Sequence, residues 1–167
     1  GVNVNQCLFW VWKLHEGAET FFSLLPYFHA FGLTFFLCAS VRKAATQVLL
    51  PKFDAQMALD AHKRRPITFF VGVPPMFERI LRLATQTKTD ISSIRYSVMP
   101  LSTTLAGEWE EVTGGMIVEG YGLSETAPVL TGAPLSDKRR HGVLGVPFPS
   151  TQLRLVSLDD DTLDVED

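Results

Sequence analysis

The sequence lacks three features that would assign it to familiar classes of protein. Its 15 Lys and Arg residues are outnumbered by 18 Asp and Glu, for a formal net charge of −3, so the charge does not predict nucleic acid binding. Its two cysteines, Cys7 and Cys38, are far apart and outside any C-x-x-C or histidine-rich context. They signal neither a zinc site nor a disulfide framework, and are typical of buried thiols in a reducing compartment.

Long apolar runs are also missing. The stretch "FHAFGLTFFLCASV" falls short of the roughly 20 residues that a membrane-spanning helix needs. The first residues, "GVNVNQCLFWVWKLHEG", have no basic leader followed by a small-residue cleavage site. We therefore expect a cytoplasmic protein. The chain of 167 residues, 46% hydrophobic and 20% charged, predicts one globular unit with a sizeable core.

Short apolar runs alternate with segments of helical spacing. The runs expected to form strands, bounded by Pro, Gly or polar residues, are 20–25, 45–50, 67–73, 94–99 and 115–119. The segments with apolar residues three or four apart, expected to form helices, are 29–43, 54–65, 74–86 and 102–113. Asp54 and Ser102 are expected N-caps, and Pro74 opens a first turn. This order predicts an α/β fold with a mostly parallel sheet flanked by helices on both faces.

The texture changes after residue 140. "HGVLGVPFPSTQLRLV" is rich in Gly and Pro and then alternates apolar and polar residues along "TQLRLV", which predicts a strand with one exposed face. We expect an α/β subdomain over 1–140 and the beginning of a β-subdomain over 141–167. The acidic end, "SLDDDTLDVED", is expected to be solvated.

Four loops follow the expected parallel strands: "PYFHAFG", "GVPPMF", "MPLSTT" and "GYGLSETAP". Ligands bind beyond the carboxyl ends of such strands, so we expect the four loops to face one cleft. Among the remaining histidines, His15 and His62 lie among charged residues and are expected at the surface. The run "DKRR" before His141 is expected to be an exposed basic turn, with attraction of the phosphates of a ligand as the alternative.

The stretch "VEGYGLSETAPVL" is open to three interpretations. A nucleophile elbow needs G-x-S-x-G, and Thr126 occupies the place of the second glycine, which argues against a serine hydrolase with Ser124 as nucleophile. A nucleotide loop uses the residues better, because glycines permit close approach, Tyr121 offers a flat face, Ser124 can donate to a phosphate oxygen and Glu125 supplies a hard ligand for Mg²⁺. A purely structural turn is the third interpretation.

Four motifs in order resemble the AMP-forming acyl-CoA synthetases, the adenylate-forming superfamily. "EGYGLSETAP" is similar to its Y-G-x-[ST]-E signature, and "LLPYFHAFGLT" to its P-x-[FY]-H-x-x-G stretch. "ITFFVGVPPMFERIL" resembles its acyl-pocket strand and following helix, and "GVLGVPFPSTQLRLV" the segment that leads into its β-subdomain. Within the superfamily the resemblance is closest to long-chain fatty acid–CoA ligases. It implies the central subdomain of the large N-terminal domain of such an enzyme.

The resemblance also implies roles for the glycine-rich loop. Tyr121 would stack on adenine, with Glu119 near the adenine edge. Gly120 and Gly122 would let the base and the acyl carbonyl approach. Ser124 and Glu125 would be the catalytic pair, with Ser124 on the AMP phosphate and Glu125 on Mg²⁺.

Substrate contacts are implied in two other loops. Phe28 and His29 would lie where the acyl group meets the pantetheine arm of CoA. Gly72, Val73 and Pro74 would line the acyl tunnel. The ligands implied are a fatty acid, ATP or AMP, Mg²⁺ and coenzyme A, and the resemblance leaves open a homodimer and peripheral membrane association at the inner face for the parent enzyme.

The chain also departs from the family. It contains no Ser/Thr/Gly-rich phosphate loop, no T-G-D motif and no C-terminal domain with the catalytic lysine, so we expect the central piece of a longer ligase with little turnover of its own. The turn over 97–101, "SVMPL", is shorter than the family's adenine-side turn. Two explanations are open: a true deletion, or residues missing from the sequence as given. A non-catalytic module that binds AMP or acyl groups is the alternative, together with the serine hydrolase.

Overall fold

A computed structural model describes residues 1–99, 103–136, 138–160 and 162–165 of the chain. Within these residues the strands form one seven-stranded sheet in the order β2-β1-β3-β4-β5-β6-β7. The strands are β1 (Thr20–Ser23), β2 (Thr46–Leu49), β3 (Phe69–Val71), β4 (Tyr96–Met99), β5 (Met116–Tyr121), β6 (Thr131–Gly132) and β7 (Val146–Pro147). Neighbours from β2 to β5 pair in parallel, whereas β6 and β7 are antiparallel additions.

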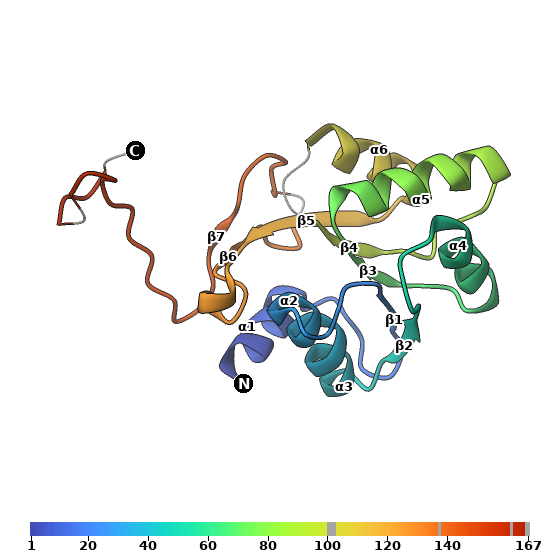
Figure 1. The fold of residues 1–167 in the computed structure, drawn as a ribbon, viewed down its shortest axis with the longest axis horizontal. Helices are drawn as coiled ribbons and strands as arrows, with labels where there is room; N and C mark the ends of the chain where they lie inside the picture. The colour runs from blue at the N-terminus through green and yellow to red at the C-terminus, as the bar shows by residue number, and fades with distance from the viewer. Residues whose placement is uncertain (100–102, 137, 161, 166–167) are drawn as a thin grey trace.

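Helices cover both faces of the sheet (Figure 1). On one face lie α4 (Ala55–Arg64), α5 (Pro74–Thr87) and α6 (Thr103–Thr113). On the other lie α1 (Val2–Trp10) and a continuous helix made of α2 (Ala30–Gly32), a π-helical segment η1 (Leu33–Ala39) and α3 (Ser40–Arg42). A short 3₁₀ turn, η2 (Ser124–Thr126), follows β5. This arrangement confirms the α/β class and the mostly parallel sheet expected from the sequence.

Local chemistry sets the helix ends. The Asp54 side chain accepts from Met57 N at 2.8 Å and caps α4, as expected. Pro74 opens α5, where a missing N–H costs no hydrogen bond. Gly114, with φ of 64°, ends α6 in the left-handed region that glycine tolerates. Ser102, the other expected cap, lies outside the described residues, and so do Pro100 and Leu101 of the shortened turn.

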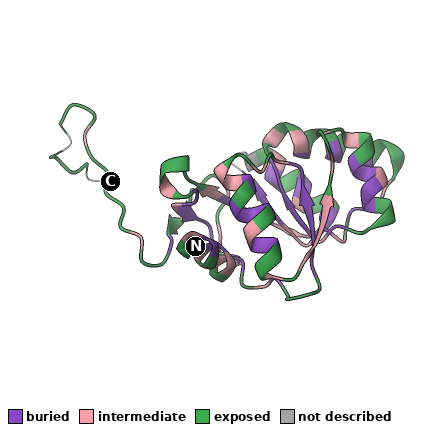
Figure 2. Ribbon diagram, turned by 60° about the horizontal axis from the view of Figure 1, so that its bottom comes forward, coloured by how far each residue is buried: buried purple, intermediate pink, exposed green. Residues whose placement is uncertain are grey.

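Adjacent apolar residues of each strand supply two separate cores. Phe22 and Phe70 pack under α4, α5 and α6 in a cluster that includes Phe77 and Trp109. Phe21 and Phe69 point to the opposite face and pack against α1 and η1. Because successive side chains of a strand point to opposite faces, a continuous apolar run such as "TFFV" serves both layers. Figure 2 shows these strands as buried between the helices.

Two features differ from the sequence-based expectation. Helix α1 was not predicted, because "VNVNQCLFW" has no clear apolar stripe. The expected strand over "TQLRLV" does not form: of these residues only Val156 makes a β-bridge, to Asp164. A lone strand gains little without neighbours to pair with and a face to bury. The segment instead leads into an exposed tail that leaves the body of the protein (Figures 1 and 2).

None of the described helices is both long enough and apolar enough to cross a bilayer.

Candidate functional site

A cavity of about 660 Å³ opens at the carboxyl edge of the parallel strands. Three of the four loops expected to face one cleft contribute to its wall: the loop after β1, the start of the loop after β3 and the loop after β5. The fourth contributes Met99, and its next residues lie outside the described part of the chain. Helix α1 and Phe148 also line the cavity.

Nearly every site residue expected from the sequence lies in this wall. These residues are Phe28, His29, Gly72, Val73, Glu119, Gly120, Tyr121, Gly122, Ser124 and Glu125. Pro74 lies one residue beyond it, as the first residue of α5. Sequence reasoning missed the contribution of α1, whose Cys7 and Trp10 line the cavity together with Val11, the residue that follows the helix. The aromatic run "CLFWVW" is the sequence signal that could have pointed to this contribution.

The loop after β5 is folded by its own threonine. Leu123 N donates to the Thr126 hydroxyl oxygen at 2.9 Å, and that hydroxyl lies 3.0 Å from Pro128 O. Thr126, the residue that argued against a nucleophile elbow, therefore closes the turn that presents Ser124 and Glu125. Both of those residues are exposed at the cavity wall. An exposed hydroxyl beside an exposed carboxylate suits contact with phosphate oxygens and their cation.

The glycines of this loop are required by the protein itself. A Cβ on Gly122 would overlap the carbonyl of Pro128, and a Cβ on Gly120 would lie 2.9 Å from Thr131 O. The expectation that these glycines admit a ligand is untested, but close approach of the chain to itself is a sufficient reason for both. Gly72 is similar: its Cβ would lie 3.0 Å from Phe70 Cζ and 3.2 Å from Phe77 Cε2. A larger side chain at Gly72 would therefore disturb core aromatics.

Glu119 places a carboxylate in the cavity wall at 2% exposure. Its Oε2 accepts from Gly142 N at 2.9 Å. Its Oε1 is buried and has no hydrogen-bond partner among the described residues. Buried acceptors are normally satisfied, so this oxygen is suited to a donor group on a ligand.

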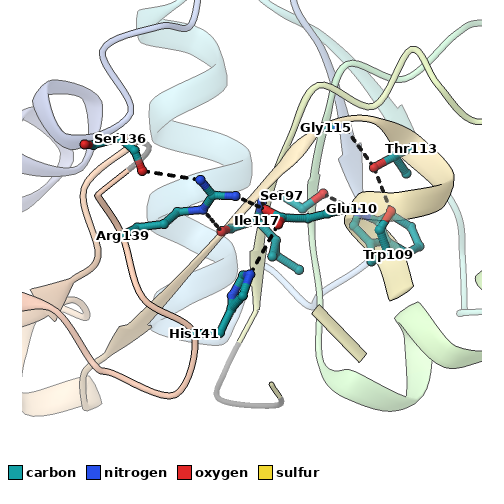
Figure 3. A network of polar contacts seen from close by, with 9 residues as sticks. All are labelled: Ser97, Trp109, Glu110, Thr113, Gly115, Ile117, Ser136, Arg139 and His141. Atoms are coloured by element: carbon teal, nitrogen blue, oxygen red, sulfur yellow. Dashed lines mark hydrogen bonds and ion pairs between the residues drawn. The ribbon is translucent and has the colours of Figure 1, made fainter. Parts of the chain in front are cut away.

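The segment that carries Gly142 is held by a polar network (Figure 3). The Arg139 guanidinium pairs with Glu110 of α6 and donates Nε to Ile117 O at 3.1 Å. His141 Nε2 lies 3.2 Å from the other Glu110 oxygen. Arg139 of the run "DKRR" is therefore bonded to the body of the fold and does not belong to an exposed basic turn. Lys138 and Arg140 are exposed, as expected.

His29 is oriented by the helix that it caps. Its Nδ1 accepts from Phe31 N at 3.2 Å, so in the neutral ring the proton lies on Nε2. The side chain is exposed and lines the cavity beside Phe28, which is 94% exposed. The preceding Tyr27 donates its hydroxyl to Gln47 of β2. His29 therefore offers an Nε2–H donor at the mouth of the cavity.

Two further groups bear on the chemistry of the site. Burial raises the pKa of the Cys7 thiol to about 12, so Cys7 is an apolar wall residue rather than a nucleophile. The described residues contain no group of three or more His, Cys, Asp or Glu side chains placed to hold a metal. Mg²⁺ is commonly bound by one or two carboxylates together with substrate phosphates. Glu125 is a single exposed carboxylate, so it fits Mg²⁺ as part of such a site.

Comparison with known proteins gives a consistent result. A family model described as "AMP-binding enzyme" matches residues 2–166. The long-chain-fatty-acid–CoA ligase of Bacillus subtilis is 34% identical over 93% of this chain and 28% of its own length. The enzyme of the same name from Yersinia pestis is 35% identical over 92% of this chain and 28% of its own. The chain therefore spans about 28% of the length of these curated relatives.

A solved structure has the same fold as this chain. ATP-bound MatB from Rhodopseudomonas palustris superposes with a TM-score of 0.82 and 25% identity, over 99% of this chain and 32% of that one.

Proposed function

Since this chain belongs to the AMP-binding enzyme family, we propose that it forms the acyl- and nucleotide-binding centre of a long-chain fatty acid–CoA ligase. The names of its bacterial relatives support this assignment. In the first half-reaction, a carboxylate oxygen of the fatty acid attacks the α-phosphorus of ATP, giving acyl-AMP and pyrophosphate. In the second, the CoA thiol sulfur, having lost its proton, attacks the acyl carbonyl carbon and AMP leaves.

The observation that carries the proposal is the composition of one cavity wall. Apolar side chains such as Val11, Phe35 and Val98 line one part, and the loop 120–125 lines another. Such a cavity can hold a hydrocarbon chain next to a nucleotide. The described residues of the wall include no Lys or Arg. An acyl group with a second carboxylate would therefore lack a counter-ion, which favours a simple long-chain acid.

The nucleotide is assigned to the loop after β5. Tyr121 stacks on the adenine ring, and Glu119 accepts from a donor on the adenine edge. Ser124 donates to an oxygen of the AMP phosphate. Glu125 holds Mg²⁺, which supplies positive charge to the phosphate oxygens when bound. These groups act by positioning and by electrostatic stabilisation.

The acyl group is assigned to the other loops. Gly72 and Val73 border the hydrocarbon, with Pro74 behind them. His29 and Phe28 lie where the acyl carbonyl meets the pantetheine arm of CoA, and the Nε2–H of His29 can donate to an oxygen there. In a longer enzyme, other segments would supply cations for the triphosphate; this chain alone is expected to bind more readily than it turns over.

The test is calorimetric titration of the 167-residue chain with AMP and with non-hydrolysable acyl-AMP analogues of increasing acyl length. Each methylene buried contributes up to about 0.8 kcal/mol, so affinity should rise by up to about fourfold per methylene until the tunnel is full. Absence of AMP binding, or affinity that is independent of acyl length, would contradict the proposal. In a longer enzyme that contains this chain, acyl-dependent pyrophosphate exchange separates a ligase from a binding-only module. Fluorophosphonate labelling of Ser124 would instead indicate a hydrolase.

A further inference from the structure

The loop that presents Ser124 and Glu125 returns to the sheet through Val129, and a side chain from the other end of the sequence holds Val129. Asn3 of α1 donates its Nδ2 to Val129 O at 2.8 Å, and Val129 N donates to Asn3 Oδ1 at 3.2 Å. One amide thus satisfies both main-chain groups of one residue, as a residue of a neighbouring antiparallel strand would. Val129 is only 8% exposed, so its main-chain groups need such a partner.

The other described bonds of this loop act elsewhere. Those of Thr126 close the turn on itself. Leu130 N donates to Tyr121 O at 2.9 Å, back to β5, and Leu130 O accepts from Phe148 N at 3.0 Å. The Asn3 bonds are different because they connect the loop directly to α1, a helix near the start of the chain. They join residues 126 positions apart.

Two more residues on the same face of α1 make bonds of this kind. Gln6 Nε2 donates to Pro149 O at 2.6 Å, and Trp10 Nε1 donates to Ala133 O at 3.0 Å. Residues 3, 6 and 10 follow the helical spacing of three and four. This polar face explains why α1 has no clear apolar stripe: its side chains dock main-chain carbonyls of the segment that follows the loop. Figure 1 shows α1 beside β6.

We propose that Asn3 is a positioning residue for the nucleotide loop, acting through Val129 on the direction in which Ser124 and Glu125 face the cavity. This inference rests on the nucleotide-binding function proposed above for that loop. Both the donor and the acceptor of the amide are needed. An aspartate has the same shape but is an acceptor only, so it would leave Val129 O without a donor and place negative charge beside it.

The test compares Asn3→Ala and Asn3→Asp with Asn5→Ala in the 167-residue chain. Asn5 is the matched control, because it lies in the same helix, is exposed and bonds the Arg42 side chain at 3.4 Å rather than the loop. Two readouts are needed: amide hydrogen exchange over residues 122–130, and AMP affinity well below the unfolding temperature. Both Asn3 variants should exchange faster in the loop and bind AMP roughly tenfold more weakly, as expected for the loss of one or two hydrogen bonds.

Asn5→Ala should match the wild type in both readouts. If Asn3→Asp, which preserves the shape of the side chain, matches Asn5→Ala in loop exchange and in AMP affinity, the positioning role is refuted while nucleotide binding stands. If loop exchange rises but the wild-type chain does not bind AMP, the structural clamp stands and it is the nucleotide-binding function that fails. Loop exchange and AMP affinity that are equal in Asn3→Ala and Asn5→Ala would likewise show that Asn3 has no positioning role.

Discussion

At the scale of single residues, Glu125 carries the clearest chemical expectation. Its side chain is exposed in a loop, so replacing it should alter unfolding free energy by no more than about 0.5 kcal/mol. Glu125→Gln preserves the shape and removes the charge that a hard cation needs. We expect Mg²⁺ to strengthen ATP binding to the wild-type chain and to have no such effect on the variant. Calorimetric titration with ATP, with and without Mg²⁺, measures this. An equal effect of Mg²⁺ on both proteins would assign the ion elsewhere.

A pair of glycines separates two reasons for having no side chain. At Gly122 a Cβ would overlap Pro128 O, whereas at Gly107, in the middle of α6, a Cβ would meet no other atom within 4 Å. Gly122→Ala should therefore force the loop open and lower unfolding free energy by about 1–3 kcal/mol, with weaker AMP binding. Gly107→Ala should raise it by about 0.5–1 kcal/mol, because alanine is the better helix former. Urea unfolding of both variants tests the contrast, and a stabilised Gly122→Ala would show that the loop is not closed as described.

At the scale of elements, α4 contains a buried histidine that the sequence did not reveal to us. His62 was expected at the surface because it stands in "AHKRR", yet it is only 6% exposed. The helical period explains the error: His62 follows the buried Ala58 and Leu59 by four and three residues, and so shares their face. Its Nδ1 accepts from Ile67 N at 3.3 Å, and its Nε2 lies 3.1 Å from Asp90 O.

This arrangement predicts a pH dependence. Burial lowers the pKa of His62 from 6.5, and the nearby Asp90 opposes this shift only in part. A lowered native pKa means that the unfolded chain takes up the proton first, so stability falls as pH drops below about 6.5 towards the native pKa. His62→Gln should reduce the difference in unfolding free energy between pH 7.5 and pH 5.5, whereas exposed His15→Gln should not. An unchanged difference in the His62 variant would show that other groups dominate the acid response.

The elements that could be predicted are those whose pattern is local. Strands such as Phe69–Val71 follow from short, bounded apolar runs, and the amphipathic helix α5 follows from its periodicity. The loop residues Ser124 and Glu125 follow from a short motif. The part of the cavity wall made by α1 could not be predicted in this way. Asn3 and Trp10 act on segments more than 120 residues away, and no local pattern carries such a distance. The expected strand over "TQLRLV" failed for a related reason, because a strand depends on partners elsewhere in the chain.

At the scale of the whole molecule, the fold brings residues that are far apart in the sequence, from Cys7 to Phe148, to one cavity. In the sheet, only β3 and β4 separate β1 from β5, although β1 and β5 are about a hundred residues apart in the sequence. The sequence separation is large because each parallel pair is joined by a crossover connection. Helix α1 precedes this series and packs against the segments that follow it, including Phe148. The cavity wall therefore depends on residues spread from Cys7 to Phe148.

The exposed tail, defined as residues 152–165, stands outside this cooperative body (Figure 2). Its hydrogen bonds among described residues include Ser157 N to Leu163 O at 3.0 Å and Val165 N to Leu155 O at 3.1 Å, both within the tail. Several apolar side chains of the tail are exposed to water, Leu158 most of all. Deleting residues 152–167 should therefore change the unfolding free energy by less than about 0.5 kcal/mol and leave AMP affinity unaltered, since the deletion spares the cavity wall and its supports. Urea unfolding and calorimetric titration of the shortened chain measure both quantities. A large loss of stability would mean that the tail packs on the body, and a loss of AMP affinity alone would extend the binding site into the tail.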